Sequence, residues 1–163
     1  MASSLPTPPS FVEHEGMHFL IFDAPNDDNL PLYMKEFQRY NVKDVVRVCE
    51  PTYNIAPLTS LGITVHDWPF SDGSGPPDQV VKEWLNLVKN RFKEANPNAI
   101  GIHCVAGLGR APVLVAIALI ELGGLEPLLA IDLIRRKRRG SINSTQLRWL
   151  RQYKRRGSKG CVV

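Results

Sequence analysis

The stretch from Ala99 to Leu122, AIGIHCVAGLGRAPVLVAIALIEL, decides the fold of this 163-residue chain. Residues 99–103 are mostly apolar, and because they are few and bounded by a glycine-rich turn they predict a short buried strand. The next residues, 104–110, predict a tight loop, and the apolar run after them predicts a core helix over 110–122. A strand, a tight loop and a helix in succession are typical of a sheet covered by helices.

The same alternation continues on both sides of this stretch. Strands are predicted at 18–22, 44–49 and 62–66, helices at 30–40, 78–96, 126–139 and 144–155, and a hairpin turn at Glu15-Gly16. The pattern predicts a three-layer α/β domain with a central, mostly parallel sheet flanked by helices. The length fits one domain, predicted over 11–156, with a flexible Pro-rich lead-in at 1–10 and a basic tail at 157–163.

The loop from Cys104 to Arg110 combines a nucleophile with an anion-binding backbone. Its two glycines allow successive backbone N–H groups to converge, which predicts phosphate binding by Val105, Ala106, Gly107, Leu108 and Gly109. The following helix directs its positive end at the same point, and the Arg110 guanidinium offers a two-pronged contact to phosphate oxygens. This positive field favours the thiolate of Cys104, so the pattern predicts attack on phosphorus and a phosphocysteine intermediate. The alternative is a buried cysteine beside an incidental glycine-rich turn.

The leaving oxygen of such a reaction needs a proton, which predicts a general acid on a nearby mobile loop. Asp72 is the candidate, because it lies among glycines and prolines in the segment 68–77, WPFSDGSGPP. The alternative is a solvated aspartate in an Asp-Gly turn. Asp67 is the weaker candidate, since it lies at the end of a predicted strand.

The net charge of +4 is unevenly distributed. Residues 1–134 hold nine Lys/Arg and sixteen acidic residues, whereas residues 135–163 hold eleven Lys/Arg and no acidic residue. A basic end predicts an anionic partner, with a solvated helix end as the alternative. A nucleic acid is disfavoured because no motif of that class is present.

The apolar runs and the cysteines exclude several classes of protein. No run approaches the ~18–20 apolar residues of a membrane span, and the N-terminus lacks the pattern of a secretion signal. Three cysteines, at 49, 104 and 161, fit neither a disulfide framework nor a zinc site. We therefore expect a cytoplasmic protein whose thiols serve chemistry.

Four segments together carry a family resemblance: HCVAGLGRAPVL (103–114), WPFSDG (68–73), VRVCEPTYN (46–54) and IRRKRRGSINSTQL (134–147). They resemble the phosphatases of regenerating liver, the type IVA protein tyrosine phosphatases, over about residues 12–156. The resemblance implies a dual-specificity-like phosphatase fold that acts on phosphotyrosine, with phosphoserine and phosphothreonine as the wider range, and uses no metal or cofactor. It implies that Cys104 is the nucleophile, Arg110 the phosphate-binding arginine and Asp72 the general acid. Ser71 departs from the family, which has a second aspartate there.

Position 111 sets the expected speed of the reaction. Most Cys-dependent phosphatases have a hydroxyl residue directly after the arginine, where it stabilises the thiolate as it leaves the intermediate. This chain has Ala111, as the resembled family does. A missing charge-assisted hydrogen bond of about 1.5–3 kcal/mol slows that step by about one to two decades. We therefore predict slow turnover and a long-lived phosphocysteine.

Cys49 ends the predicted strand that lies beside the strand leading to Cys104. Parallel neighbouring strands end at the same edge, which brings a reversible disulfide between Cys49 and Cys104 within reach, but a buried apolar cysteine is the more common role of a cysteine on a strand. The resemblance implies this pairing.

The basic end and the resemblance together imply partners. A polybasic segment beside a prenylated Cys161 would anchor the chain to the inner face of the plasma membrane or to endosomes, but only two residues follow Cys161, where a prenylation motif needs three. The resemblance also implies homotrimers, and a rival function as a catalytically weak module that docks magnesium-transporter CBS domains through the phosphate pocket. Arg138 matches a family position in that partner contact.

Overall fold

The computed structural model describes residues 5–73 and 75–156 of the chain. Five strands form one sheet in the order β1-β2-β5-β3-β4, in which only β1 is antiparallel to its neighbour. The strands are β1 (Ser10–His14), β2 (Met17–Phe22), β3 (Val42–Arg47), β4 (Thr64–Asp67) and β5 (Ala99–His103). The helices are α1 (Leu30–Arg39), α2 (Ala56–Ser60), α3 (Asp78–Phe92), α4 (Arg110–Glu121), α5 (Pro127–Lys137) and α6 (Ser144–Arg151).

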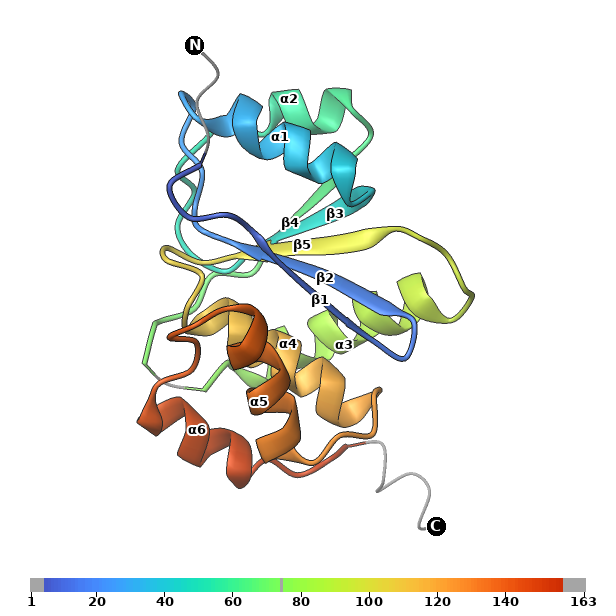
Figure 1. Ribbon diagram of the computed structural model, residues 1–163, viewed down its shortest axis with the longest axis vertical. Helices are drawn as coiled ribbons and strands as arrows, with labels where there is room; N and C mark the ends of the chain where they lie inside the picture. The colour runs from blue at the N-terminus through green and yellow to red at the C-terminus, as the bar shows by residue number, and fades with distance from the viewer. Residues whose placement is uncertain (1–4, 74, 157–163) are drawn as a thin grey trace.

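The helices form a layer on each face of the sheet. Figure 1 shows α1 and α2 on one face and α3 to α6 on the other. Strand β5 lies in the middle of the sheet with every residue buried, and α4 follows it with ten consecutive buried residues from Ala111 to Ile120. A helix that is apolar all round must be enclosed by other elements. The three-layer α/β fold predicted from the sequence is thereby confirmed.

Short elements account for most differences from the predicted elements. Strand β1 and helix α2 have five residues each and were not predicted. The predicted hairpin turn is confirmed, because Glu15 and Gly16 both have positive φ and join β1 to β2. Helix α3 ends at Phe92 and α6 at Arg151, four residues earlier than predicted in each case, since helical periodicity does not mark a helix end that lacks a stop signal.

The carboxyl ends of β3 and β5 lie side by side and position the candidate site. These strands are parallel, with Arg47 opposite His103, and the pairing extends one residue further through a hydrogen bond from Val48 N to His103 O. Ligands bind such sheets beyond the carboxyl ends of the strands. Cys49 and Cys104, the residues that follow, therefore lie at the edge where a site is expected.

Candidate active site

The Cys104 loop (Cys104–Arg110) turns its carbonyl groups outward. The carbonyls of Val105 and Leu108 accept hydrogen bonds from Ala24 N (2.9 Å) and Ile142 N (2.7 Å). Those of Ala106 and Gly107 both accept from the Arg138 guanidinium, at 3.0 and 2.8 Å. In a planar trans peptide the C=O and the next N–H point in opposite directions. The N–H groups of residues 106–109 are therefore turned away from these outer partners, as an anion-binding loop requires.

The two loop glycines serve different purposes. Gly107 has φ +69°, and a Cβ there would lie 2.6 Å from the Phe22 carbonyl oxygen. Gly109 has φ −121°, so it is needed for space rather than for backbone freedom. A Cβ at Gly109 would lie 2.9 Å from Gln146 Nε2 and 3.0 Å from Asp72 Oδ1. Gly109 thus marks the point where the acid loop and α6 approach the Cys104 loop.

Cys104 and Arg110 occupy the two ends of this loop. Cys104 is buried directly after β5, and Arg110 is the first residue of α4, whose positive end faces the loop. Arg110 Nη1 donates to the carbonyls of Val48 (3.3 Å) and Phe70 (2.9 Å), which fixes the guanidinium. Its Nε is buried without a hydrogen-bond partner among the described residues. An unpaired buried donor on a fixed cation is a typical feature of an anion site.

Asp72 and Asp67 differ sharply in their surroundings. The Asp72 side chain is 66% exposed, and its Oδ1 lies 4.0 Å from Arg110 Nε, on the loop that precedes α3. Asp67 is held by two hydrogen bonds from the buried Arg47, at 2.6 and 2.8 Å. Of the two acids considered from the sequence, only Asp72 lies beside the Cys104 loop, and it is not held by two hydrogen bonds from an arginine as Asp67 is.

Cys49 lies at the same edge as Cys104. Both are buried free thiols, and burial raises the pKa of Cys49, while the positive charge of Arg110 acts against that rise. Cys49 Sγ is 3.9 Å from Nδ1 of His103, the residue that precedes Cys104.

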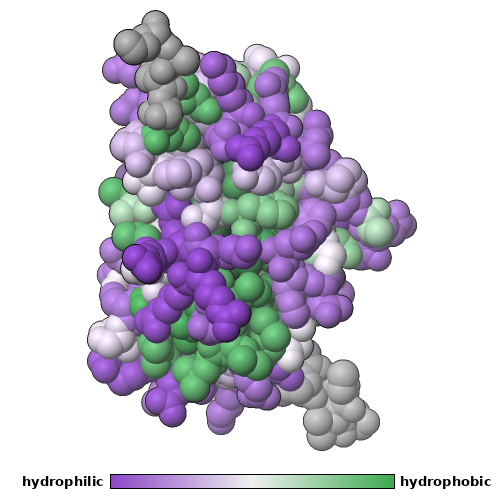
Figure 2. All heavy atoms as spheres, viewed as in Figure 1, coloured by the Kyte–Doolittle hydropathy of each residue, from purple (hydrophilic) through white to green (hydrophobic). Residues whose placement is uncertain are grey.

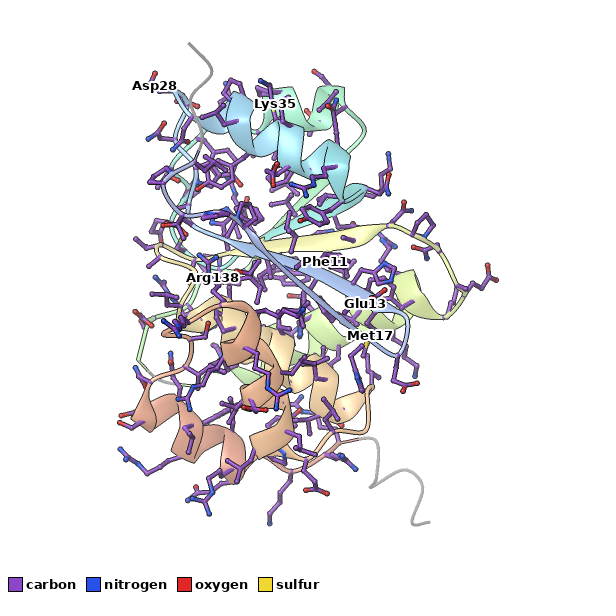
Figure 3. All side chains as sticks on the ribbon, viewed as in Figure 1. Phe11, Glu13, Met17, Asp28, Lys35 and Arg138 are labelled. Carbon is purple, nitrogen blue, oxygen red and sulfur yellow. The ribbon has the colours of Figure 1, made fainter. Side chains whose placement is uncertain are left out.

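Arg138, which the family resemblance places in a partner contact, is buried in this structure. Arg138 is only 4% exposed and binds the outside of the Cys104 loop, whereas Lys137 and Arg139 on either side of it are exposed. Figure 3 labels Arg138 between α5 and the loop after β5. Direct contact between Arg138 and a partner is therefore disfavoured by its burial. Cys161 lies outside the described residues.

Two contributors to the site were missed by sequence reasoning. Gln146 is 2% exposed, and its Nε2 has no hydrogen-bond partner among the described residues and lies beside Gly109. Its local signal is a capping box with Asn143, which predicts the start of α6 but not the direction of the amide. The second is Tyr53, whose hydroxyl forms a hydrogen bond with Nε2 of His103, the residue directly before the Cys104 loop. No group of three or more His, Cys, Asp or Glu within 5–73 and 75–156 is arranged to hold a metal ion.

Comparison with known proteins agrees with this geometry. Residues 27–124 match a family described as "Polymorphic toxin system, DSP-PTPase phosphatase". The chain is 57% identical over 161 residues to a probable protein tyrosine phosphatase type IVA A of Dictyostelium discoideum, with 99% of this chain and 96% of that one covered. It is 51% identical over 146 residues to the human protein tyrosine phosphatase type IVA 3, with 90% of this chain and 84% of the relative covered.

A solved structure extends the agreement to three dimensions. A putative protein tyrosine phosphatase from Leishmania major is 45% identical and superimposes with a TM-score of 0.80, covering 91% of this chain and all of the other. The identities and coverage, together with the arrangement of the Cys104 loop, show that this chain belongs to the type IVA, or PRL, family of Cys-dependent protein tyrosine phosphatases.

Proposed function

We propose that the chain hydrolyses phosphotyrosine in proteins through a phosphocysteine on Cys104. Phosphoserine and phosphothreonine would be additional substrates if the enzyme has dual specificity. The observation that carries the proposal is the outward orientation of four consecutive carbonyls, Val105 to Leu108, next to a buried Cys104 and a fixed Arg110. A dianionic phosphoryl group is the ligand that such a loop and guanidinium favour.

In the first step, the Cys104 thiolate attacks phosphorus and forms an S–P bond. The bond between phosphorus and the tyrosyl oxygen breaks, and Asp72, in its protonated form, donates a proton to that oxygen. The exposed Asp72, which lies within 4.0 Å of Arg110 Nε, is close to where this oxygen would leave. The loop amides and Arg110 hold the three non-bridging oxygens.

In the second step, water attacks the phosphocysteine. The Asp72 carboxylate takes a proton from the water, the S–P bond breaks, phosphate leaves and the thiolate returns. The unpaired amide Nε2 of Gln146 beside Gly109 supports a role in orienting this water. Ala111 is buried and has no hydroxyl to stabilise the departing thiolate, so this second step limits turnover.

Rapid quenching tests this proposal directly. The protein is mixed with a phosphotyrosyl peptide, quenched in acid within one turnover, and its intact mass is measured. We expect the mass of one added phosphoryl group, located on Cys104 by peptide mapping, and no addition on a Cys104→Ser variant. An unmodified wild-type protein with a reduced Cys104 would overturn the catalytic proposal.

Oxidation of Cys104 extends the proposal to regulation. Peroxide oxidises the Cys104 thiolate to a sulfenic acid and is itself reduced, and the Cys49 thiol then displaces the hydroxyl as water to form a disulfide. The neighbouring strand ends of β3 and β5 and the shared contact with His103 support this pairing. The disulfide would protect Cys104 from irreversible oxidation while blocking catalysis.

Association with an anionic membrane is supported by one face of the molecule. Figure 2 shows an apolar area over the α5 side, bordered by hydrophilic residues, and Leu128 and Leu129 of α5 are exposed. Helix α6 packs against α5, and Arg148, Arg151 and Lys154, on and just after α6, are exposed as well. None of the helices among the described residues has the length and apolar character that crossing a membrane requires, so we propose attachment at the surface, with Cys161 as the lipid site. Loss of binding to phosphatidylserine vesicles in a Leu128→Ser/Leu129→Ser variant would support this face, and unchanged binding would exclude it.

A second candidate function is docking of magnesium-transporter CBS domains at the phosphate pocket. The observation in its favour is an apolar rim, with Val105 62% and Leu108 37% exposed beside the anion-binding loop. Such a rim suits a protein surface that delivers an acidic loop. Competition between inorganic vanadate and the CBS domain in a binding titration would support this function, and simultaneous binding of both would contradict it.

A further inference from the structure

The buried Arg138 joins three parts of the chain to the back of the Cys104 loop. It is the C-cap residue directly after α5, and its extended backbone (φ −142°, ψ 95°) turns the side chain away from the helix. Nε donates to Gly107 O at 2.8 Å, and Nη2 donates to Ala106 O at 3.0 Å and to the Asp23 carboxylate. Nη1 lies 3.1 Å from Ser10 Oγ, 3.3 Å from Pro8 O and 3.4 Å from Ile21 O. Every nitrogen of the guanidinium is therefore engaged on the outer side of the loop.

Two of these contacts fix the orientation of two peptide groups in the anion-binding part of the Cys104 loop. The carbonyls of Ala106 and Gly107 precede the N–H groups of Gly107 and Leu108, so holding the carbonyls outside turns those N–H groups to the opposite side. Gly107, at φ +69°, has no Cβ to prevent the adjoining peptides from flipping. A flipped peptide would present a carbonyl oxygen, a partial negative charge, to the phosphoryl group.

We propose that Arg138 is a positioning residue for the phosphatase reaction, which fixes the Ala106 and Gly107 carbonyls outside the loop so that the following amides bind the phosphoryl group. The inference rests on the proposed function of the Cys104 loop. Arg138 does not contact the substrate, because its donors are all used on the outer side. The carboxylate of Asp23 balances the charge of this buried guanidinium, which would otherwise be costly to bury.

The proposal also explains one member of a basic run. Of the five basic residues from Arg135 to Arg139, Arg138 alone is buried, while Arg136, Lys137 and Arg139 are exposed. The exposed Arg139 is therefore a matched control, because its removal changes the charge equally at a neighbouring position, and among the described residues its side chain makes no hydrogen bond to the Cys104 loop.

The test compares Arg138→Met and Arg138→Lys with Arg139→Met. The measured quantities are the inhibition constant of inorganic phosphate, KM and kcat for a phosphotyrosyl peptide, and the rate of Cys104 alkylation by iodoacetamide as a function of pH. We expect Arg138→Met to raise the inhibition constant and KM about tenfold or more, and to shift Cys104 alkylation to higher pH because fewer amides face the thiolate. Arg138→Lys should give intermediate values, since an ammonium group cannot reproduce the planar fork. Arg139→Met should match the wild type within about twofold, as surface substitutions usually do.

If Arg138 only stabilised the fold, its replacement would lower the melting temperature without changing phosphate inhibition or Cys104 alkylation. Ser10→Ala removes one contact of Nη1 but none to the loop, so it should lower the melting temperature slightly and leave phosphate inhibition unchanged. If Arg138→Met does not fold, the phosphate inhibition and alkylation profile of Arg138→Lys distinguish the positioning role from a structural one. A folded Arg138 variant with wild-type phosphate inhibition and alkylation profile would overturn the positioning role. The absence of a phosphocysteine in the wild type would instead overturn the proposed function.

Discussion

The imidazole of His103 is held in one tautomer between Tyr53 and the Cys104 carbonyl. His103 Nδ1 lies 3.1 Å from Cys104 O, which can only accept, so Nδ1 carries the hydrogen. Nε2 then accepts from the Tyr53 hydroxyl at 2.8 Å. Burial lowers the pKa of His103 from 6.5 to about 4. The neutral imidazole thus supports the first residue of the Cys104 loop from below.

His103 makes folding stability sensitive to pH on the acid side. Protonation is easier in the unfolded chain, so this contribution is complete above pH 6.5 and is lost as the pH falls towards 4. We expect the free energy of unfolding to fall by up to about 3 kcal/mol across this range. Urea unfolding at a series of pH values measures it, and a His103→Gln variant should show a shallower dependence. Equal slopes for the two proteins would contradict the assignment.

Introducing a hydroxyl at position 111 should speed the second chemical step. Ala111 is buried in the first turn of α4, beside the Cys104 loop, and Ala111→Ser would offer the leaving thiolate a hydrogen bond. We expect kcat to rise about 10- to 100-fold and the lifetime of the phosphocysteine intermediate to fall by the same factor. Quench-flow and steady-state assays measure both. A faster first step with unchanged hydrolysis of the intermediate would refute this explanation.

Removing the Asp72 carboxyl should matter most for poor leaving groups. Asp72→Asn should slow phosphocysteine formation from phenyl phosphate about 100-fold or more, but from p-nitrophenyl phosphate only slightly, because nitrophenolate leaves without a proton. Ser71→Ala, a change at the neighbouring exposed residue, is the control and should leave both rates unchanged. Equal losses with the two substrates would exclude Asp72 as the general acid.

Close packing of Gly75 on Trp149 should hold the acid loop in place. A Cβ at Gly75 would overlap Cε2 and Nε1 of the Trp149 indole, so the loop or the indole must move in Gly75→Ala. We expect phosphocysteine formation to slow about tenfold, mainly with poor leaving groups, as for a partly misplaced acid. The double variant Gly75→Ala/Trp149→Ala creates space and should recover part of the rate. No recovery would indicate that the loop is not positioned by this contact.

Cys49 should determine whether oxidation is reversible. After hydrogen peroxide treatment, the wild type is expected to regain most of its activity with dithiothreitol, whereas Cys49→Ser should lose activity permanently as Cys104 proceeds to sulfinic acid. Intact mass distinguishes a loss of two hydrogens from a gain of oxygen. Full recovery of the Cys49→Ser variant would exclude the protective disulfide.

The main features of the fold were predictable because they depend on local patterns. Strand β5, the Cys104 loop and helix α4 follow one another within 23 residues, so their apolar runs and glycines indicate the order of the elements directly. Helix α2 and strand β1 were missed because five residues carry too little periodicity. Cys104, Arg110 and Asp72 were proposed from local motifs, and the structure places Asp72 beside Gly109 and Arg110.

The sequence by itself determined which residues are the candidates for the chemistry, since a nucleophile, two glycines and an arginine at this spacing form one continuous segment. Only the tertiary structure decided what supports them. Arg138 reaches the loop from 31 residues away, and neither its burial nor the exposure of Arg139 can be read from a run of five basic residues. Gln146 likewise gains its place beside Gly109 only when α6 packs. The physical reason is that side-chain direction at a helix end depends on the backbone angles there and on the neighbours that accept its hydrogen bonds.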